Sequence, residues 1–292
     1  MPPIILRNVT PTGIPLEAIF LPELGMNMIS YKQGKIEVID QSTRPLFEER
    51  FAGLGALIGP HFHHRLPATI PPIADESLFP HIARVKQKGV HEPFSHGIGR
   101  YASWKAEATP TALEAHLSGD DEWRGVRLSC LEGQNFQMHF RAELTPKELK
   151  IHFSVASETS SLVGLHYYYA LPQGKGTVHS RIQSHVLENS AKKPPRWKMN
   201  EQQEVAISLG EEEIDTTFFP FTNPQSGKIL LDAGSYQLEK RYRCDSPENA
   251  WQLYHPKAAS FVCIEPLSSQ DPRHPHLTRS ALQVEIEILE AP

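Results

Sequence analysis

Residues 136–155 read FQMHFRAELTPKELKIHFSV, and this stretch decides the fold class. Hydrophobic residues occupy every second position on both sides of the four residues Thr145-Pro146-Lys147-Glu148. A period of two is typical of a strand that buries one face. The proline-containing segment between the two runs fits a turn. The stretch therefore predicts an antiparallel β-hairpin with a four-residue connection.

The same period of two recurs elsewhere in the chain. It is present in residues 282–288, in residues 236–242 and, more briefly, in residues 126–130. Glycine, proline, asparagine and aspartate separate these runs. We therefore expect each run to form a strand, bounded by turns.

Helical periodicity is weak by comparison. The best candidate spans roughly residues 76–88, and it requires Pro80 to lie in the first helical turn. No repeat of fixed period and no low-complexity linker divides the sequence. The sequence therefore predicts an all-β protein in which residues 1–292 form one domain, a large antiparallel β-sandwich with few short helices.

The composition of the 292-residue chain is globular, with 39% hydrophobic and 22% charged residues. A net charge of −5 argues against nucleic acid as a partner, and no hydrophobic run approaches the roughly 18 residues of a membrane helix. The N-terminal residues lack a signal-peptide pattern, so we expect a cytoplasmic protein. Cys130, Cys244 and Cys263 have no disulfide or metal spacing and are expected to be buried thiols.

Histidine is unusually frequent, at 15 of 292 residues, and three histidines lie in residues 59–65, GPHFHHR. In a strand, His61, His63 and Arg65 would share one face. Two imidazoles on one face can bind a single metal ion. The alternative is a polar segment that lines a cleft without metal. No further metal ligand has a recognisable spacing, which favours a polar segment that lines a cleft without metal.

Residues 93–100, PFSHGIGR, place two glycines beside His96 and Arg100. This pattern indicates a tight loop whose backbone approaches a ligand, with an ordinary turn as the alternative. The glycine spacing does not match a phosphate-binding fingerprint.

Residues 162–171, LVGLHYYYAL, have strong strand character. Alternation would place His166 and Tyr168 on one face and Tyr167 and Tyr169 on the other. An imidazole held among aromatic and small side chains can donate or accept a proton. The alternative is a core histidine that bonds to a hydroxyl group.

Two carboxylates complete the set of candidate residues. Glu265 comes at the end of the hydrophobic run FVCIEP, where burial would raise its pKa and make it a useful base. Asp215 lies close to Phe218 and Phe219, a composition common in sugar recognition. Glu265 could instead lie beyond the strand in solvent, and Asp215 could form a capping turn.

In chain order, these segments resemble the aldose 1-epimerase family, the galactose-mutarotase-like proteins. The resemblance covers nearly the whole chain, and its most specific elements are His166-x-Tyr168 and Glu265-Pro266. It also includes Gly25–Ser30 and the segments around Arg65, His96 and Asp215. The resemblance implies a large β-sandwich and a cofactor-free isomerase that interconverts the α and β anomers of an aldose by opening and closing its ring.

The resemblance also implies a role for each residue. Glu265 would be the general base on the anomeric hydroxyl, and His166 would be the general acid on the ring oxygen. His96 would assist, and Arg65 and Asp215 would hold sugar hydroxyls. At neutral pH this scheme needs an ionised Glu265 and a protonated His166, whose mutual attraction would favour both charged forms. No metal or other cofactor is expected, the partner is a small sugar, and the protein is a monomer or homodimer.

The identity of the sugar stays open. One branch of the superfamily acts on hexose 6-phosphates and uses additional arginines, and Arg65, Arg100 and Arg124 are available here.

Two other functions stay open as well. The first is a non-catalytic carbohydrate-binding β-sandwich, and the second is a metal-dependent jelly-roll enzyme built on His61 and His63. The presence of both His166 and Glu265 favours the isomerase.

Overall fold

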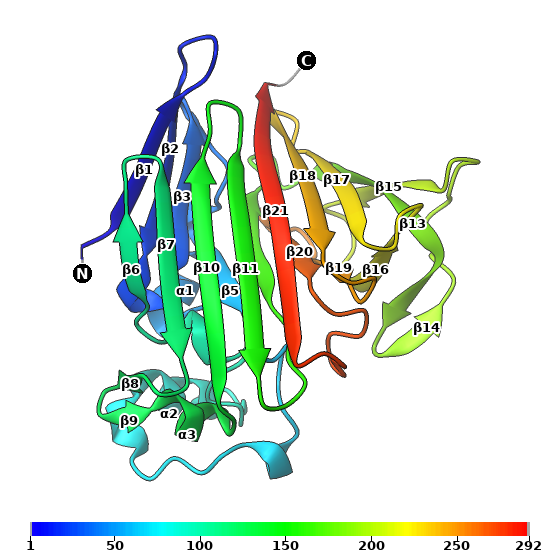
Figure 1. The fold of residues 1–292 in the computed structure, drawn as a ribbon. Helices are drawn as coiled ribbons and strands as arrows, with labels where there is room; N and C mark the ends of the chain where they lie inside the picture. Colours follow the sequence, from blue (N-terminus) through cyan, green and yellow to red (C-terminus); the bar gives the residue numbers. More distant parts are fainter. Residues whose placement is uncertain (1, 291–292) are drawn as a thin grey trace.

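Two layers of antiparallel strands make up most of the protein (Figure 1). A computed structural model describes residues 2–290 of the chain. Within this range, 19 strands form one continuous hydrogen-bonded sheet, which folds over to give two layers, here called layers A and B. The expectation of a large antiparallel β-sandwich is confirmed.

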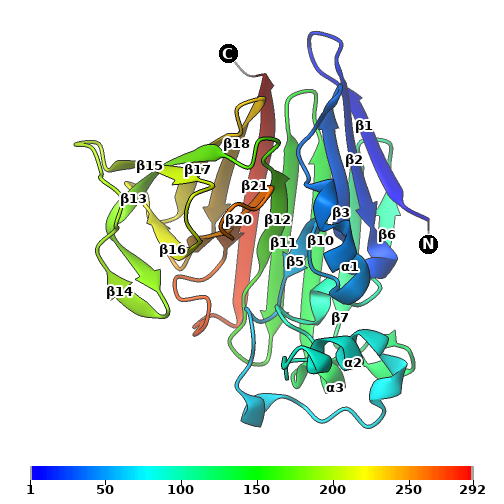
Figure 2. The same ribbon diagram turned by 180° about the vertical axis from the view of Figure 1, so that it is seen from behind.

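Layer A faces the viewer in Figure 2 and layer B in Figure 1. The strands of layer A follow the order β1 (Ile4–Val9), β2 (Pro15–Leu21), β3 (Asn27–Gln33), β5 (Gly55–Ile58), β12 (Gly164–Ala170), β20 (Phe261–Leu267), β19 (Ala250–His255), β16 (Ile214–Pro220), β13 (Gly176–Glu188) and β14 (Ala191–Lys193), with β4 (Ile36–Glu37) added beside β3. The strands of layer B follow the order β6 (Lys105–Ala108), β7 (Ala112–Ser118), β10 (Phe136–Leu144), β11 (Leu149–Ser157), β21 (Arg279–Glu290), β18 (Tyr236–Cys244), β17 (Ser226–Asp232), β13 and β15 (Glu204–Leu209). A separate small ribbon consists of β8 (Glu122–Trp123) and β9 (Val126–Arg127).

The long strand β13 joins the two layers. Its first half, residues 176–181, pairs with β15 and β17 of layer B. Its second half pairs with β16 of layer A after a register shift between Ile182 and Val186. Because one strand crosses from layer to layer, the sheet turns the corner without a break in its hydrogen bonding.

The core lies between the layers, where side chains of both inner faces meet. The rings of Phe20 and Phe140, one from each layer, lie 5.9 Å apart. The buried Lys240 of layer B donates a 2.6 Å hydrogen bond to the backbone carbonyl of Ile264, and its ammonium group lies 4.6 Å from the centre of the Tyr169 ring. Burial lowers the pKa of Lys240 well below its usual value. The hydrogen bond ties layer B to β20 one residue before Glu265.

The hairpin predicted for residues 136–155 is present as β10 and β11. Its register runs from Phe136 opposite Ser157 to Leu144 opposite Leu149. The side chain of Thr145 accepts hydrogen bonds from the backbone N–H groups of Lys147 and Glu148, which closes the turn. The alternate hydrophobic residues of both strands are buried against layer A, as their period of two predicts.

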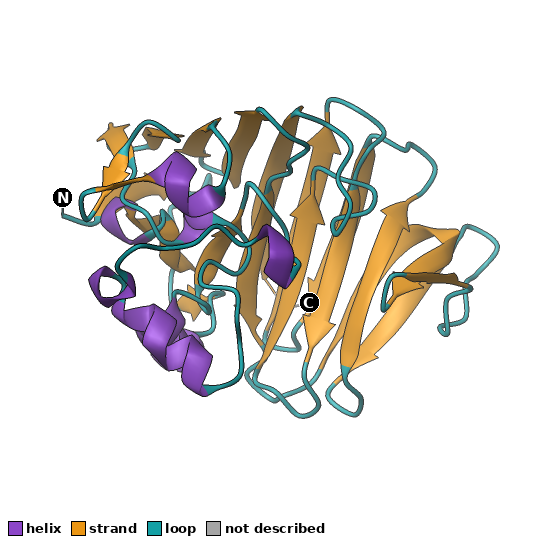
Figure 3. Ribbon diagram, turned by 90° about the horizontal axis from the view of Figure 1, so that it is seen from below, coloured by secondary structure: helices purple, strands orange, loops and turns teal. Residues whose placement is uncertain are grey.

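The helical segments are short, and most of them gather on the side of the molecule where the N-terminus lies (Figure 3). They are η1 (Pro22–Leu24), η2 (Gln41–Thr43), α1 (Arg44–Arg50), η3 (Pro67–Thr69), η4 (Glu76–Leu78), α2 (Pro80–Gln87), η5 (Ile98–Arg100) and α3 (Leu128–Glu132). The helix expected within residues 76–88 is confirmed as η4 and α2, and Pro80 opens α2 as its fixed φ angle requires. None of the helices within residues 2–290 is long and apolar enough to cross a membrane.

The strand expected for residues 126–130 is wrong. Only Val126 and Arg127 are extended, and α3 begins at Leu128. Leu128 and Leu131 are three residues apart and both buried, so the segment also satisfies helical periodicity. The expectation of three buried thiols is wrong for Cys130, which α3 exposes, whereas Cys244 and Cys263 are buried.

Candidate active site

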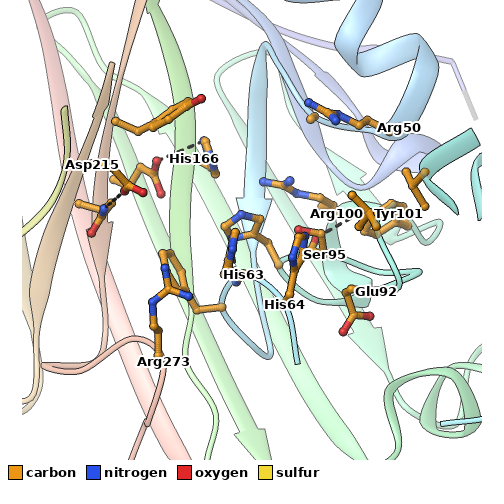
Figure 4. A pocket seen from close by; sticks show the side chains of 18 of the residues that line it. Arg50, His63, His64, Glu92, Ser95, Arg100, Tyr101, His166, Asp215 and Arg273 are labelled. Carbon is orange, nitrogen blue, oxygen red and sulfur yellow. Dashed lines mark hydrogen bonds and ion pairs between the residues drawn. The ribbon is translucent and has the colours of Figure 1, made fainter. Parts of the chain in front are cut away.

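A cavity of about 290 Å³ opens on the outer face of layer A. Its floor comes from β12, β20, β19 and β16, and its walls come from residues 62–64 and 92–101 and from Arg50 and Arg273. In Figure 4, His166 and Asp215 lie on one side of the cavity, Arg50 and Arg100 lie on the other, and His63 lies between them. Four of the five site residues expected from the sequence line this cavity: His96, His166, Asp215 and Glu265.

The alternation of side chains along two neighbouring strands places His166 and Glu265 at the cavity. On β12, Tyr167 and Tyr169 face the core, while His166 and Tyr168 face the cavity. Tyr168 pairs with Cys263 on the neighbouring strand β20, so Glu265, two residues further along β20, faces the same side. The rings of His166 and Tyr168 stack with their centres 5.0 Å apart, which fixes the orientation of the imidazole.

His166 and Glu265 approach each other on the cavity floor. His166 Nδ1 lies 3.4 Å from Glu265 Oε1. The two side chains are 9% and 2% exposed. His166 Nδ1 and Glu265 Oε2 have no hydrogen-bond partner among the described residues. Buried polar atoms are rarely left unpaired, so this pair is a candidate for contact with a ligand.

Burial controls the charge state of the pair. Burial, and then the charge of Arg100, lower the pKa of His166 well below its usual value. Burial, and then the charge of Asp215, raise the pKa of Glu265 well above its usual value. Burial is the largest cause of each shift and favours the neutral forms, against the mutual attraction that was expected to favour the charged forms. Both shifts favour the state in which a proton shared by the pair lies on Glu265 and not on His166.

His96 lies beside this pair, with its ring centre 5.0 Å from that of His166. The backbone N–H of His63 donates a 3.1 Å hydrogen bond to His96 Nδ1, so a neutral His96 carries its proton on Nε2. Burial, and then the charge of Arg100, lower the pKa of His96 well below its usual value. His96 is thus a neutral donor.

The loop that carries His96 is as tight as its glycines predict. A Cβ atom on Gly97 would lie 2.1 Å from the carbonyl oxygen of Gly59, and Gly97 has a φ of +89°. The close approach that Gly97 permits is to the backbone of Gly59, and His96 and Arg100 of the same loop line the cavity.

Arg100 ends this loop and is almost fully buried, at 3% exposure. Its Nε donates a 3.1 Å hydrogen bond to the carbonyl of Leu57, but its Nη2 has no partner within residues 2–290. Arg50, on the same side of the cavity, likewise has a buried Nε without a partner in this part of the chain. A buried guanidinium group without an anion is costly, so this side of the cavity suits a negatively charged group.

Arg65, expected to hold sugar hydroxyls, does not line the cavity. Its guanidinium group makes hydrogen bonds of 2.9 and 2.8 Å to Glu92 and one of 2.6 Å to the carbonyl of Glu132. Burial raises the pKa of Glu92, but the hydrogen bond from Arg65 and the nearby charges outweigh it and lower that pKa to about 2. Arg65 thus supports the wall of the cavity, and its assignment as a sugar ligand is corrected.

Asp215 lies at the opposite edge and accepts a hydrogen bond from Gln252 Nε2. Thr217 donates a 2.5 Å hydrogen bond to Gln252 Oε1, which fixes the orientation of the amide. Gln252 lies directly opposite Glu265 in the sheet. The sequence interpretation missed Gln252, although a glutamine among the hydrophobic residues Ala250, Trp251 and Leu253 of β19 was a usable signal.

Within residues 2–290, His61 and His63 do not belong to any group of side chains that could hold a metal ion. Residues 59–66 are not a strand, and His63 has a φ of +57°, so the two histidines do not share a face. His61 Nδ1 lies 2.5 Å from Glu132 Oε1, and His63 stacks on His64. Burial, and then the charge of His64, lower the pKa of His63 to about 4.

Three residues at the cavity floor or directly behind it, His166, Glu265 and Cys263, have potential ligand atoms within 4.8 Å of one another. Burial raises the pKa of the Cys263 thiol well above its usual value. Since thiolates and not thiols bind metals, this group is poorly prepared as a metal centre.

The fold and cavity place the protein in a known structural class. No protein-family model matches the sequence, and no curated protein sequence matches it. The chain has the fold of the galactose-mutarotase-like proteins. It is similar to a galactose mutarotase related enzyme from Lactobacillus acidophilus, with a TM-score of 0.63 and 14% identity over 100% of this chain and 98% of that one. A galactose mutarotase-like protein from Lactobacillus casei matches with a TM-score of 0.65 and 12% identity over 98% and 100% of the two chains. At these identities the similarity establishes the fold.

Proposed function

We propose that the protein is an aldose 1-epimerase-type isomerase that interconverts the α and β anomers of an aldose or sugar phosphate. One observation carries the proposal. An imidazole and a carboxyl group lie 3.4 Å apart on the floor of a cavity, and each has a buried polar atom without a partner. The names of the structural neighbours point to the same chemistry.

Ring opening needs two proton transfers on the same hemiacetal. A base removes the proton of the anomeric hydroxyl while an acid protonates the ring oxygen, and ring closure on the other face reverses both steps. In this proposal Glu265 is the base and His166 the acid. His96 donates a hydrogen bond from Nε2 to the same hemiacetal. Asp215 and Gln252 bind sugar hydroxyls.

The proposed reaction needs one proton on the pair. Movement of that proton from Glu265 to His166, over 3.4 Å, produces the carboxylate and imidazolium of the proposed scheme. Arg100 favours the carboxylate form, because its charge lowers the pKa of Glu265. The same charge lowers the pKa of His166. A substrate anion that neutralises Arg100 would therefore make His166 easier to protonate.

Arg100 supports the sugar-phosphate part of the proposal and leads to a prediction. Replacing Arg100 with glutamine should raise KM for a phosphorylated aldose at least about tenfold, because a hydrogen bond to a charged group is worth about 1.5–3 kcal/mol. KM for the corresponding neutral aldose should change much less. The measurement compares both sugars in wild type, Arg100→Gln and the charge-preserving Arg100→Lys, which should lose less. Equal losses for both sugars would remove the anion subsite from the proposal.

The function itself is tested by following anomer exchange. Nuclear magnetic resonance exchange or polarimetry should show faster anomerisation for at least one member of a panel of neutral aldoses and hexose 6-phosphates. Binding of a sugar without acceleration of any panel member would instead support the carbohydrate-binding alternative.

A further inference from the structure

A second group of potential ligands lies on the outer face of layer B, far in the fold from the cavity just described. Glu114 and His116 on β7 and His139 on β10 all point away from the core, because the residues alternating with them are buried. His116 and His139 are directly opposite each other in the register of β7 and β10. Their rings stack with centres 4.4 Å apart and planes at 20°.

The donor atoms of the three side chains lie close together. Glu114 Oε1 lies 2.8 Å from His139 Nε2 and 3.8 Å from His116 Nε2. All three potential ligand atoms lie within 4.8 Å of one another. In tetrahedral coordination with bonds of about 2.0–2.1 Å, ligand atoms are roughly 3.3 Å apart. The two observed distances fall on either side of that value, so shifts of about 0.5 Å would bring these atoms to coordination geometry.

The surroundings favour a cation as well. Glu107 on β6 is directly opposite Glu114, and like charges in this position are destabilising. Two basic residues are also neighbours in register, Lys105 beside His116 and Arg141 beside Glu114. Each is paired with another acid, Lys105 with Asp121 and Arg141 with Glu143. These ion pairs leave Glu114 available to the histidines.

The group also borders open space. His116 and His139 line a cavity of about 370 Å³ together with polar residues that include Gln137, Ser154 and Ser280. Three protein ligands beside a cavity leave a coordination position for water or a small ligand. Two imidazoles and one carboxylate form a donor set that zinc accepts in proteins.

We propose that Glu114, His116 and His139 form a binding site for a zinc-type divalent cation, with one coordination position open to the adjoining cavity. The site is independent of the isomerase proposal, since it shares no residue with the cavity on layer A. Failure of either proposal leaves the other unaffected.

The test is titration of metal-free, full-length protein with Zn²⁺ alone, measured by calorimetry or by competition with a chromogenic chelator. Wild type should bind one equivalent at micromolar Zn²⁺. His116→Gln and His139→Gln should each weaken this binding at least about tenfold, since even residues that only support a ligand are worth 10–100-fold. All three side chains are on the protein surface, so circular dichroism should show that the variants fold normally.

The matched control is His152→Gln. His152 lies on the neighbouring strand β11, with its ring centre 6.4 Å from that of His139, and is outside the proposed set. This variant should bind Zn²⁺ like wild type.

Co²⁺ tests the ligand set, because Glu114, His116 and His139 include no thiol and would give no thiolate charge-transfer band, unlike the cluster that contains Cys263. Absence of Zn²⁺ binding in wild type, unchanged binding in the His116→Gln/His139→Gln double variant, or a thiolate band would each overturn the proposal.

Discussion

Replacing Glu265 with glutamine is expected to slow anomer interconversion at least about a hundredfold, since a positioned base contributes about 10²–10⁴ in rate. Glutamine keeps the size of the side chain but cannot take the proton of the anomeric hydroxyl. The loss should fall on kcat, with a smaller change in KM, because the proton transfer takes place only in the transition state. Measuring anomer exchange rates over a range of substrate concentrations separates the two constants.

The control for this substitution is Glu143→Gln, an exposed carboxylate on β10 whose ion pair with Arg141 spans 3.5 Å. It makes the same chemical change far from the cavity and should leave the rate unaltered. A Glu265→Gln variant with near-normal kcat would show that Glu265 is not the base.

The same variant has an expected effect on stability, opposite in sign to its effect on rate. Because burial raises the pKa of Glu265, the folded protein binds this proton more tightly than the unfolded chain. The stability that this bound proton contributes is therefore complete below the usual glutamate pKa, and it is lost as the pH rises through the raised pKa of Glu265. At alkaline pH, the folded wild type must hold an ionised carboxylate in a buried position, which is costly. Glutamine cannot ionise, so Glu265→Gln should have a higher melting temperature than wild type at alkaline pH. Thermal unfolding experiments should show that the difference in melting temperature between Glu265→Gln and wild type shrinks as the pH falls toward 4.5.

The strands that carry the site could be predicted from sequence because each has a regular local pattern. The alternation in residues 162–171 predicts which side His166 faces, and β12 has that arrangement. The burial of Glu265 follows from its place in a hydrophobic run of β20. In both cases the period of a strand is a property of neighbouring residues, so no knowledge of distant contacts is needed.

The loops could not be predicted in this way. Arg65 was expected to bind sugar, but its place is decided by Glu92 and Glu132, which are 27 and 67 residues away. Arg100, in contrast, donates to the carbonyl of Leu57 and has a buried Nη2 without a partner among the described residues, and nothing local in the sequence reveals that difference. In the same way, the segment at Leu128 fits both a strand and a short helix, and tertiary packing decides between them.

Charge states were the least accessible from sequence. An imidazole beside a carboxylate suggests an ion pair, but the outcome depends on how much water the fold excludes. Here both side chains are less than a tenth exposed, so burial dominates the pKa of each.

Replacing His166 with asparagine is the second substitution expected to have a large effect, again at least about a hundredfold on kcat. Asparagine keeps a polar group on the cavity floor but cannot pass a proton to the ring oxygen. His152→Asn, on the outer face of layer B, is the control and should be neutral. The informative measurement is kcat/KM as a function of pH.

In wild type, the active form of the pair carries one proton. Activity should therefore fall at low pH, where both groups are protonated, and at high pH, where neither is, which gives a bell-shaped profile. Without His166, only Glu265 titrates, so the residual activity should rise with pH through the raised pKa of this carboxyl group and show no falling limb. A bell that persists in His166→Asn would mean that another group supplies the acid, and His96, whose Nε2 carries a proton, would then take that role.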